Sequence, residues 1–251
     1  MKNKKYIART IALAAVAGLL PVWTCVGAGT NDAGETAKSP AQRTWEESVD
    51  KGYKHLILHQ GAMAYVEENP SLPRVLLIGD SISIGYTVPV RKLLAGKANV
   101  LRIPANDGPS TNGIQFLAQW LGDKKWDVIH FNWGLHDCFR KVPLAQYKAN
   151  LETLVGQLQA TGAKLIWASS TPIPENNPWK TTAGIEVEYN AAAKAIMEKH
   201  GIAINDLHAQ VSPHFAEYVV KPGDVHFKGN GSAFLGQQVA AAIEKALGTE
   251  K

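Results

Sequence analysis

Short apolar runs recur along the chain from residue 74 onward, and a polar or glycine-rich segment follows each one. A continuous apolar run of this length is typical of a strand that is buried on both faces of a parallel sheet. The pattern therefore predicts one buried strand for each run. The runs lie at residues 75–78, 98–103, 126–131, 164–168 and 202–204.

Segments with helical periodicity lie between and after these runs. Residues 190–199 are rich in alanine, and residues 232–247 have the pattern of a terminal helix. Strands that alternate with helices predict an α/β domain with a parallel sheet. The clearest helix has apolar side chains three and four residues apart, which places them on one face: Leu144, Tyr147, Leu151, Leu154 and Leu158.

Polar segments directly follow the first three apolar runs. Ser81 follows the first run, Asn106 to Gly108 the second, and Gly134 to Asp137 the third. Because ligands bind beyond the carboxyl ends of the strands in such sheets, we expect these residues to share one edge.

The amino terminus has the pattern of a secretory signal. Basic residues within the first nine positions precede the apolar run 11–20, and Val26-Gly27-Ala28 offers small residues for cleavage. The run is too short to span a bilayer comfortably. We therefore expect an exported protein with a signal peptide at 1–28, a flexible linker at 29–43 and a single domain at 44–251. A lipid anchor at Cys25 is the alternative.

Composition sets the broad class of the protein. Of 251 residues, 45% are hydrophobic and 19% charged, which suits one globular core. The net charge of +4 falls once the basic leader is removed, so nothing indicates a nucleic-acid partner. The sequence shows no closely spaced ligand cluster, so we expect no metal and no cofactor. Cys138 is interpreted as a small buried hydrophobe, with a nucleophile as the alternative.

Two distant segments carry candidate chemistry. Ser81 lies at the entry to a predicted helix, where it could attack a substrate or cap the helix. His226 follows Gly223, Asp224 and Val225 in a loop before the last helix. Histidine is the usual general base for a serine hydroxyl, and a nearby carboxylate would orient its ring.

Two further segments supply candidate hydrogen-bond donors. Gly108, after Asn106 and Asp107, allows close backbone approach to a substrate, although the segment also fits an ordinary turn. A polar side chain within the segment Asn132 to Asp137 could donate to an oxyanion. The alternative is that His136 and Asp137 satisfy backbone groups of their own loop.

The joint order of these segments resembles the SGNH hydrolases, also called the GDSL esterase/lipase family. The segments 79–83, 106–108, 134–137 and 223–226 are similar to the family's first, second, third and fifth blocks. The resemblance implies a flavodoxin-like three-layer α/β/α sandwich with a parallel sheet of about five strands. It also implies a nucleophile at Ser81, a base at His226, and an oxyanion hole formed by Ser81, Gly108 and His136. Asp80, Asn106 and Asp137 would support them.

The chain departs from the family's pattern at two positions. His136 stands where the family usually has asparagine, and an imidazole can also donate one hydrogen bond. Gly223 stands where the family usually has the acid, three residues before the histidine, and Asp224 stands only two before. In extended backbone a shift of one residue turns a side chain to the opposite side. The sequence therefore leaves open a Ser-His-Asp triad through Asp224 or a Ser-His dyad.

The resemblance implies a serine ester hydrolase that forms an acyl-enzyme on Ser81 and acts on a small-molecule or glycan ester. Deacetylation of a carbohydrate is the first hypothesis, because the resemblance is to a family rich in acetyl-sugar esterases and export is expected. Trp133 and Trp179, in loops near strand ends, could stack on sugars and add slight support. The second is a lysophospholipase-like esterase for lipid or small esters. The third is a non-catalytic glycan-binding module on the same fold, which the missing acid at position 223 favours.

Overall fold

A computed structural model of the chain describes residues 38–249. Contacts divide the chain into residues 1–39 and 40–251, and every described helix and strand belongs to the second unit. The strands are β1 Arg74–Ile78, β2 Asn99–Arg102, β3 Val128–Phe131, β4 Lys164–Ala168 and β5 Ala203–Asn205. The α-helices are α1 Pro40–Ser48, α2 Ser81–Leu93, α3 Ser110–Leu121, α4 Leu135–Arg140, α5 Leu144–Gln159, α6 Glu186–Lys199, α7 Leu207–Val211, α8 Phe215–Tyr218 and α9 Gly229–Leu247. The 3-10 helices are η1 Lys51–Gln60 and η2 Ser212–His214.

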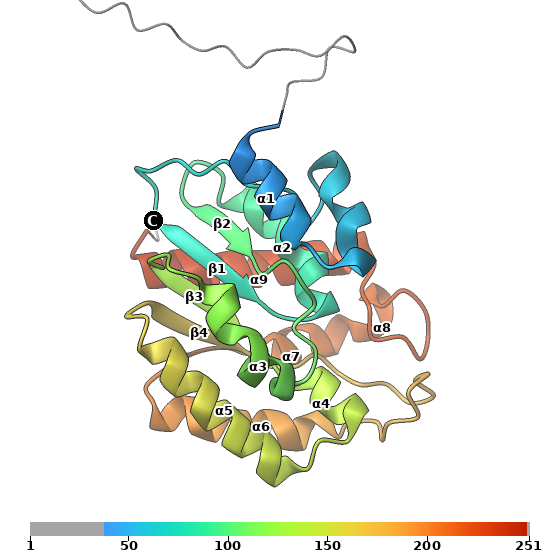
Figure 1. The fold of residues 1–251 in the computed structure, drawn as a ribbon. Helices are drawn as coiled ribbons and strands as arrows, with labels where there is room; N and C mark the ends of the chain where they lie inside the picture. Colours follow the sequence, from blue (N-terminus) through green and yellow to red (C-terminus); the bar gives the residue numbers. More distant parts are fainter. Residues whose placement is uncertain (1–37, 250–251) are drawn as a thin grey trace, which may run out of the picture. The chain divides into compact units, whose positions relative to one another are not determined.

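The five strands form one parallel sheet with the order β2-β1-β3-β4-β5 (Figure 1). Leu76 of β1 is paired with Leu101 of β2 on one side and with Ile129 of β3 on the other. Each predicted apolar run overlaps one of these strands, so the predicted sheet is confirmed. The strand order places a topological switch point between β1 and β3, where the crevice at the carboxyl edge is expected to bind ligands.

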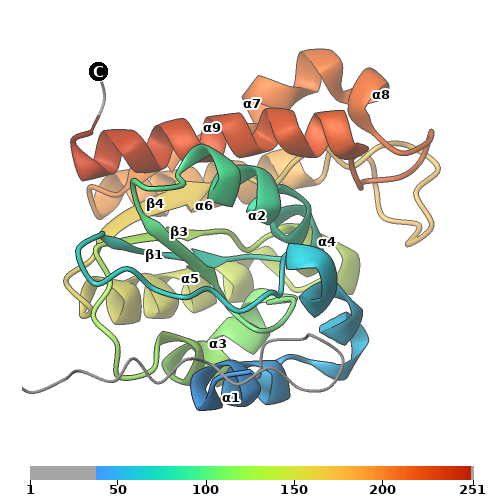
Figure 2. The same ribbon diagram turned by 90° about the horizontal axis from the view of Figure 1, so that it is seen from above.

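Helices cover both faces of the sheet. Helices α2 and α9 pack together on one face, and α3, α5 and α6 lie on the other (Figure 2). This arrangement confirms the predicted three-layer α/β/α sandwich. The predicted helix face of α5 is buried against the sheet, because Tyr147, Leu151, Leu154 and Leu158 are fully buried.

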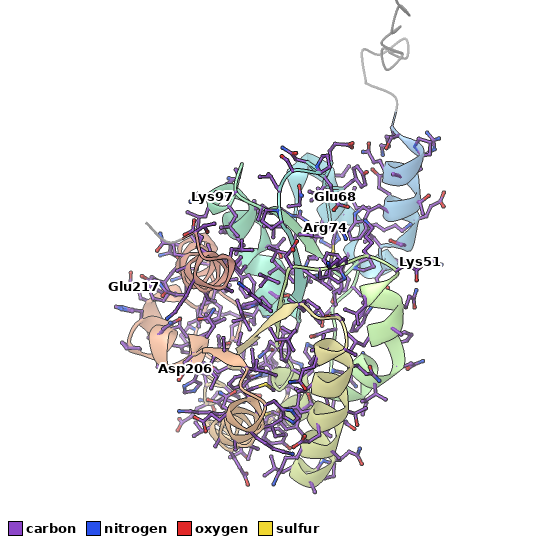
Figure 3. The ribbon with its side chains drawn as sticks, turned by 90° about the vertical axis from the view of Figure 1, so that its left-hand side faces the viewer. Lys51, Glu68, Arg74, Lys97, Asp206 and Glu217 are labelled. Atoms are coloured by element: carbon purple, nitrogen blue, oxygen red, sulfur yellow. The ribbon has the colours of Figure 1, made fainter. Side chains whose placement is uncertain are left out.

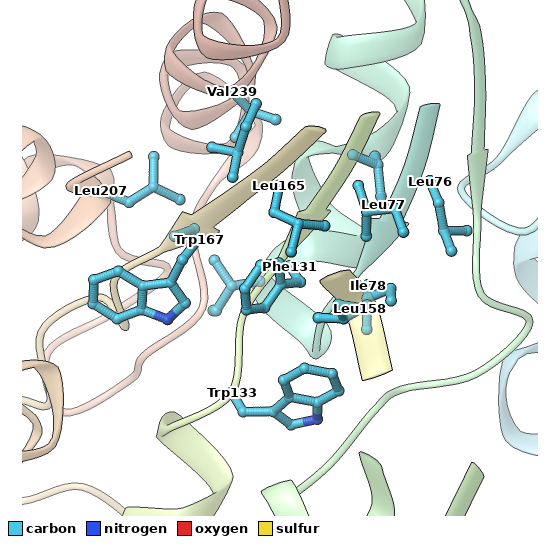
Figure 4. Close-up of a cluster of buried hydrophobic side chains, with 14 of the residues drawn as sticks. Leu76, Leu77, Ile78, Phe131, Trp133, Leu158, Leu165, Trp167, Leu207 and Val239 are labelled. Atoms are coloured by element: carbon cyan, nitrogen blue, oxygen red, sulfur yellow. The ribbon is translucent and has the colours of Figure 1, made fainter. Parts of the chain in front are cut away.

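The core is built from the apolar strand residues and the inward faces of the helices (Figure 4). Trp126 and Trp167 belong to it, as the sequence pattern indicates. Trp133 is also in the core with only 1% of its surface exposed, so it is not available to stack on a sugar. Cys138 is 3% exposed, and burial raises the pKa of its thiol, which agrees with a small buried hydrophobe.

The first described helix begins inside the segment expected to be a flexible linker. Helix α1 starts at Pro40, so residues 40–43 of the expected linker are helical. Proline is well suited to the first turn of a helix, because its missing N–H would have no partner there. Trp45 ties α1 to the chain beyond it through a hydrogen bond from Nε1 to the carbonyl oxygen of Met63. The expected signal peptide and Cys25 lie outside the described residues.

Charged pairs gather at the amino-end edge of the sheet. Arg74, the first residue of β1, forms an ion pair with Glu68 (Figure 3). Its guanidinium also lies over the ring of Trp126. Lys97, just before β2, is paired with Glu244 near the end of α9. The polar groups at the opposite, carboxyl edge are therefore separate from this charged end. Within residues 38–249, no helix has the length and apolar character needed to cross a membrane.

Candidate active site

The turn from β1 into α2 presents Ser81 at the carboxyl edge of the sheet. Asp80 is the N-cap of α2, and its Oδ1 accepts the backbone N–H of Ile82 at 2.8 Å. Asp80 is buried, with 4% exposure, and its backbone oxygen accepts a hydrogen bond from the Ser83 hydroxyl. Because Asp80 performs the capping, the side chain of Ser81 is free for another partner.

That partner is His226, which lies 145 residues further along the chain. His226 Nε2 and Ser81 Oγ are 3.0 Å apart, and His226 Nδ1 lies 2.8 Å from Asp224 Oδ1. Asp224 Oδ1 also accepts the backbone N–H of His226 at 3.0 Å. The three side chains therefore form a continuous hydrogen-bonded series from hydroxyl to carboxylate.

The electrostatics of Asp224 suit a carboxylate that stays ionised. Partial burial raises the pKa of Asp224, but hydrogen bonds from the backbone and ring of His226 outweigh it, so this pKa lies below its ordinary value. A carboxylate at Nδ1 holds the proton on that nitrogen and leaves Nε2 free to accept the serine proton.

A close backbone contact explains why the acid stands at 224 and not at 223. Gly223 has a φ of 80°, and a Cβ there would lie 2.8 Å from the carbonyl oxygen of Asn176. The chain turns at this point, with the Asp224 N–H bonded to the Lys221 carbonyl. The alternation expected of extended backbone therefore does not apply, and Asp224 faces His226.

Gly108 lies in the loop after β2, beside the Ser81 turn. Its φ is 62°, a left-handed conformation that favours glycine, and a Cβ would displace the Asn112 side-chain nitrogen, which would lie 2.5 Å away. Its N–H donates to Asn106 Oδ1 at 3.0 Å. For this N–H to donate to an oxyanion, its hydrogen bond with Asn106 would have to break. The sequence pattern does not reveal this requirement.

The loop after β3 contributes His136 and Asp137 from the first turn of α4. The His136 ring is half-buried against the edge of Phe139 and has no hydrogen-bond partner among residues 38–249. Asn132, in contrast, donates to the carbonyl oxygen of Ala168 at 2.6 Å and is committed to the end of β4. The indole N–H of Trp133 also lacks a partner but is buried in the core, so His136 is the polar side chain of segment 132–137 that is both partly exposed and unbonded.

Asp137 links this loop to the start of α3. Both of its carboxylate oxygens accept the Ser110 N–H at 3.0 Å, and the Ser110 hydroxyl donates to Oδ1 at 2.6 Å. Asn150 of α5 donates to the same hydroxyl at 2.9 Å. Burial raises the pKa of Asp137 to about 6 although the hydrogen bonds from Ser110 lower it. Asp137 therefore has a supporting position and fixes α4 to the loop that carries Gly108.

An aromatic pair borders the candidate site. The exposed ring of Trp179 stacks on Phe139, with centroids 4.2 Å apart and planes 11° from parallel. The Trp179 centroid is 6.3 Å from that of His226. Sequence reasoning singled out Trp179 but missed Phe139, because an aromatic residue on a short helix has no distinguishing signal.

The raised pKa of Asp137 predicts a specific pH dependence of stability. Between an unfolded aspartate pKa of ~4 and the folded value of about 6, the folded state binds more protons than the unfolded state. The contribution of Asp137 to the free energy of unfolding therefore falls as pH rises through this window. Across this window the free energy of unfolding of the wild type should fall by up to about 3 kcal/mol more than that of Asp137→Asn. Urea denaturation at a series of pH values measures the difference.

The exposed Asp123 provides a matched control. Asp123→Asn should show the same pH dependence as the wild type. A difference between wild type and Asp137→Asn that stays constant across the window would contradict the role of burial at Asp137.

Comparisons with known proteins found a matching family model and solved structures of similar fold. The GDSL-like Lipase/Acylhydrolase family matches residues 77–234. Among solved structures, the chain is similar to a lipase/acylhydrolase from Enterococcus faecalis, with a TM-score of 0.62, 18% identity and coverage of 69% of this chain and 96% of that one. It is also similar to a GDSL-like lipase from Bacteroides thetaiotaomicron, with a TM-score of 0.60, 17% identity and coverage of 74% and 94%.

A third similar structure is an acetylxylan esterase from Geobacillus stearothermophilus, with a TM-score of 0.58 and 19% identity. The match covers 71% of this chain and 95% of that protein. At these identities, the three structures show a shared fold. No curated protein matches the sequence.

Proposed function

Because this chain belongs to the GDSL-like lipase/acylhydrolase family, we propose that it hydrolyses esters with Ser81 as the nucleophile. The observation that carries the proposal is the series of hydrogen bonds from Ser81 through His226 to Asp224. The hypothesis of a non-catalytic glycan-binding module depended on the missing acid at position 223. The contact of Asp224 with His226 argues against that hypothesis.

In the proposed reaction, His226 accepts the Ser81 proton at Nε2 as the serine oxygen attacks the ester carbonyl. Asp224 stabilises the imidazolium that forms. The backbone N–H groups of Ser81 and Gly108, together with the ring of His136, hold the oxyanion. His226 then protonates the leaving alcohol, and a water molecule, deprotonated by the same ring, releases the acyl group from Ser81.

We propose an acetylated carbohydrate as the substrate. The stacked pair of Trp179 and Phe139 supports this choice, because an exposed indole face beside the base can pack against a sugar ring. The likeness to an acetylxylan esterase adds support at the level of the fold. A lipid or small ester is the second candidate, favoured by the likeness to two lipases.

Export remains part of the proposal. The basic start, the apolar run 11–20 and the small residues 26–28 are the features that support a cleaved signal peptide at 1–28. The domain would then act outside the cytoplasm, where acetylated polysaccharides are accessible.

Replacement of the nucleophile tests the proposed reaction directly. Ser81→Ala should reduce kcat on phenyl acetate by at least about 10³-fold, because it removes the oxygen that would form the acyl-enzyme. The measurement is the initial rate of acetate release by the purified domain, on phenyl acetate and on acetylated xylo-oligosaccharides. Ser83→Ala should retain measurable hydrolysis, and equal rates in wild type and Ser81→Ala would refute the proposal.

The displaced acid generates a second prediction. Asp224→Asn should lower kcat by about 10²- to 10⁴-fold, because the amide no longer fixes the useful tautomer of His226. The double variant Gly223→Asp with Asp224→Gly restores the family's usual spacing, yet it should not recover activity. A side chain at 223 would meet the Asn176 carbonyl and require an unfavourable φ. Recovery to more than half of the wild-type kcat would show that the turn does not select the position of the acid.

The aromatic pair predicts a substrate-dependent effect. Trp179→Ala should raise KM for acetylated xylo-oligosaccharides by about 2- to 10-fold, because the stacking surface is lost. The same variant should leave kcat/KM on phenyl acetate unchanged within about twofold. Trp45→Ala, outside the site, is the control. Equal losses on both substrates would assign Trp179 to the stability of the site and not to sugar binding.

A further inference from the structure

A buried arginine lies directly behind the Ser81 turn. Arg102 is the last residue of β2, and 1% of its surface is exposed. Its Nη2 donates to the carbonyl oxygen of Gly79 at 2.9 Å and to the hydroxyl of Ser83. Since Ser83 in turn donates to the backbone oxygen of Asp80, Arg102 holds the turn at two points.

The other guanidinium nitrogen holds the neighbouring loop. Nη1 of Arg102 donates to the carbonyl oxygens of Ala105 at 2.7 Å and of Ile103 at 3.2 Å. Ala105 directly precedes the segment from Asn106 to Gly108. One planar cation therefore joins the turn that carries Ser81 to the loop that carries Gly108, and its rigid fork fixes their relative position.

Burial of a guanidinium costs desolvation free energy, so its presence here requires a physical reason. Within residues 38–249, no carboxylate forms a hydrogen bond with Arg102, and its Nε has no partner. Burial lowers the pKa of Arg102 to about 10, although the nearby carboxyl of Asp107 raises it, and the group remains charged at neutral pH. An apolar residue of similar volume would fill the same space without this desolvation. The directed hydrogen bonds to backbone carbonyls are what such a residue would lose.

We propose that Arg102 is a positioning residue that sets the spacing between the backbone N–H groups of Ser81 and Gly108. The proposal rests on the proposed esterase function. Oxyanion stabilisation requires donors that are fixed before the reaction, so a loose spacing should weaken binding of the tetrahedral intermediate more than binding of the ester. Loss of Arg102 should therefore lower kcat and leave KM nearly unchanged.

Arg91 of α2 offers a matched control. Its guanidinium is partly buried and, like that of Arg102, donates to backbone carbonyls, those of Val100 at 3.0 Å and Gly61 at 3.2 Å. Neither carbonyl belongs to the Ser81 turn or the Gly108 loop. Arg91→Met therefore removes a comparable set of hydrogen bonds without touching either loop.

The experiment compares Arg102→Met, Arg102→Lys and Arg91→Met in the full domain. Steady-state kinetics on phenyl acetate are combined with the rate at which a fluorophosphonate labels Ser81, followed by mass spectrometry, and with urea denaturation. Arg102→Met should lower kcat and the labelling rate by about 10²-fold, with KM within about twofold of wild type. Arg91→Met should lose stability but keep kcat within about twofold of wild type.

Arg102→Lys keeps the charge and tests the geometry if Arg102→Met fails to fold. An ammonium cannot bind the Gly79 and Ala105 carbonyls as a planar fork, so kcat should still fall by at least about 10-fold. Guanidinium ion, well below denaturing concentrations, should raise the kcat of Arg102→Ala, whereas methylammonium should not.

The outcomes separate this proposal from the esterase function. If Arg102→Lys and a folded Arg102→Met keep the wild-type kcat while Ser81→Ala is inactive, Arg102 has no positioning role. If Arg91→Met loses as much kcat as Arg102→Met at an equal loss of stability, the role of Arg102 is structural and the proposal is also overturned. If Ser81→Ala retains wild-type hydrolysis and the fluorophosphonate does not label Ser81, the esterase proposal itself fails.

Discussion

The close packing of α2 against α9 brings the two ends of the site together. Helix α2 begins at Ser81, and α9 begins three residues after His226. At their crossing, a Cβ on Gly236 would lie 2.6 Å from the Cβ of Pro89, so the helices approach as closely as glycine allows. The packing holds the start of α2 near the loop before α9, where Ser81 and His226, 145 residues apart, form their hydrogen bond.

A second backbone contact determines both the position of the acid and one wall of the site. The Asn176 carbonyl lies against the Cα of Gly223 and leaves no space for a side chain there. The loop that supplies this carbonyl also carries Trp179, which stacks on Phe139 beside His226. The shift of the acid to Asp224 and the aromatic border of the site are therefore consequences of the same packed loop.

The sequence predicted those features that depend on local pattern. Apolar runs located the strands, and the rule for parallel sheets brought Ser81, Gly108 and His136 to one edge. Features that depend on contacts between distant loops could not be predicted. The contact of Asp224 with His226 depends on a turn at Gly223, which packs against the Asn176 carbonyl. The hydrogen bond from Asn132 to the Ala168 carbonyl, at the end of β4, depends on the register of the sheet. A helix start at Pro40 was hidden because small polar residues also suit a linker.

Three polar links join the loops of the site in series. Arg102 connects the Ser81 turn to the Gly108 loop, Asp137 connects that loop to α4 through Ser110, and His226 closes the series on Ser81. Apolar packing is non-directional and tolerates small shifts, whereas hydrogen bonds to a rigid guanidinium or carboxylate fix both distance and orientation. Asp137 and Arg102 are costly to bury, and an apolar core would be cheaper at both positions. Both residues connect loops of the site. Their positions indicate that the fold is less stable there than it would be with apolar residues, and that the hydrogen-bond donors of the site are held in a more precise geometry.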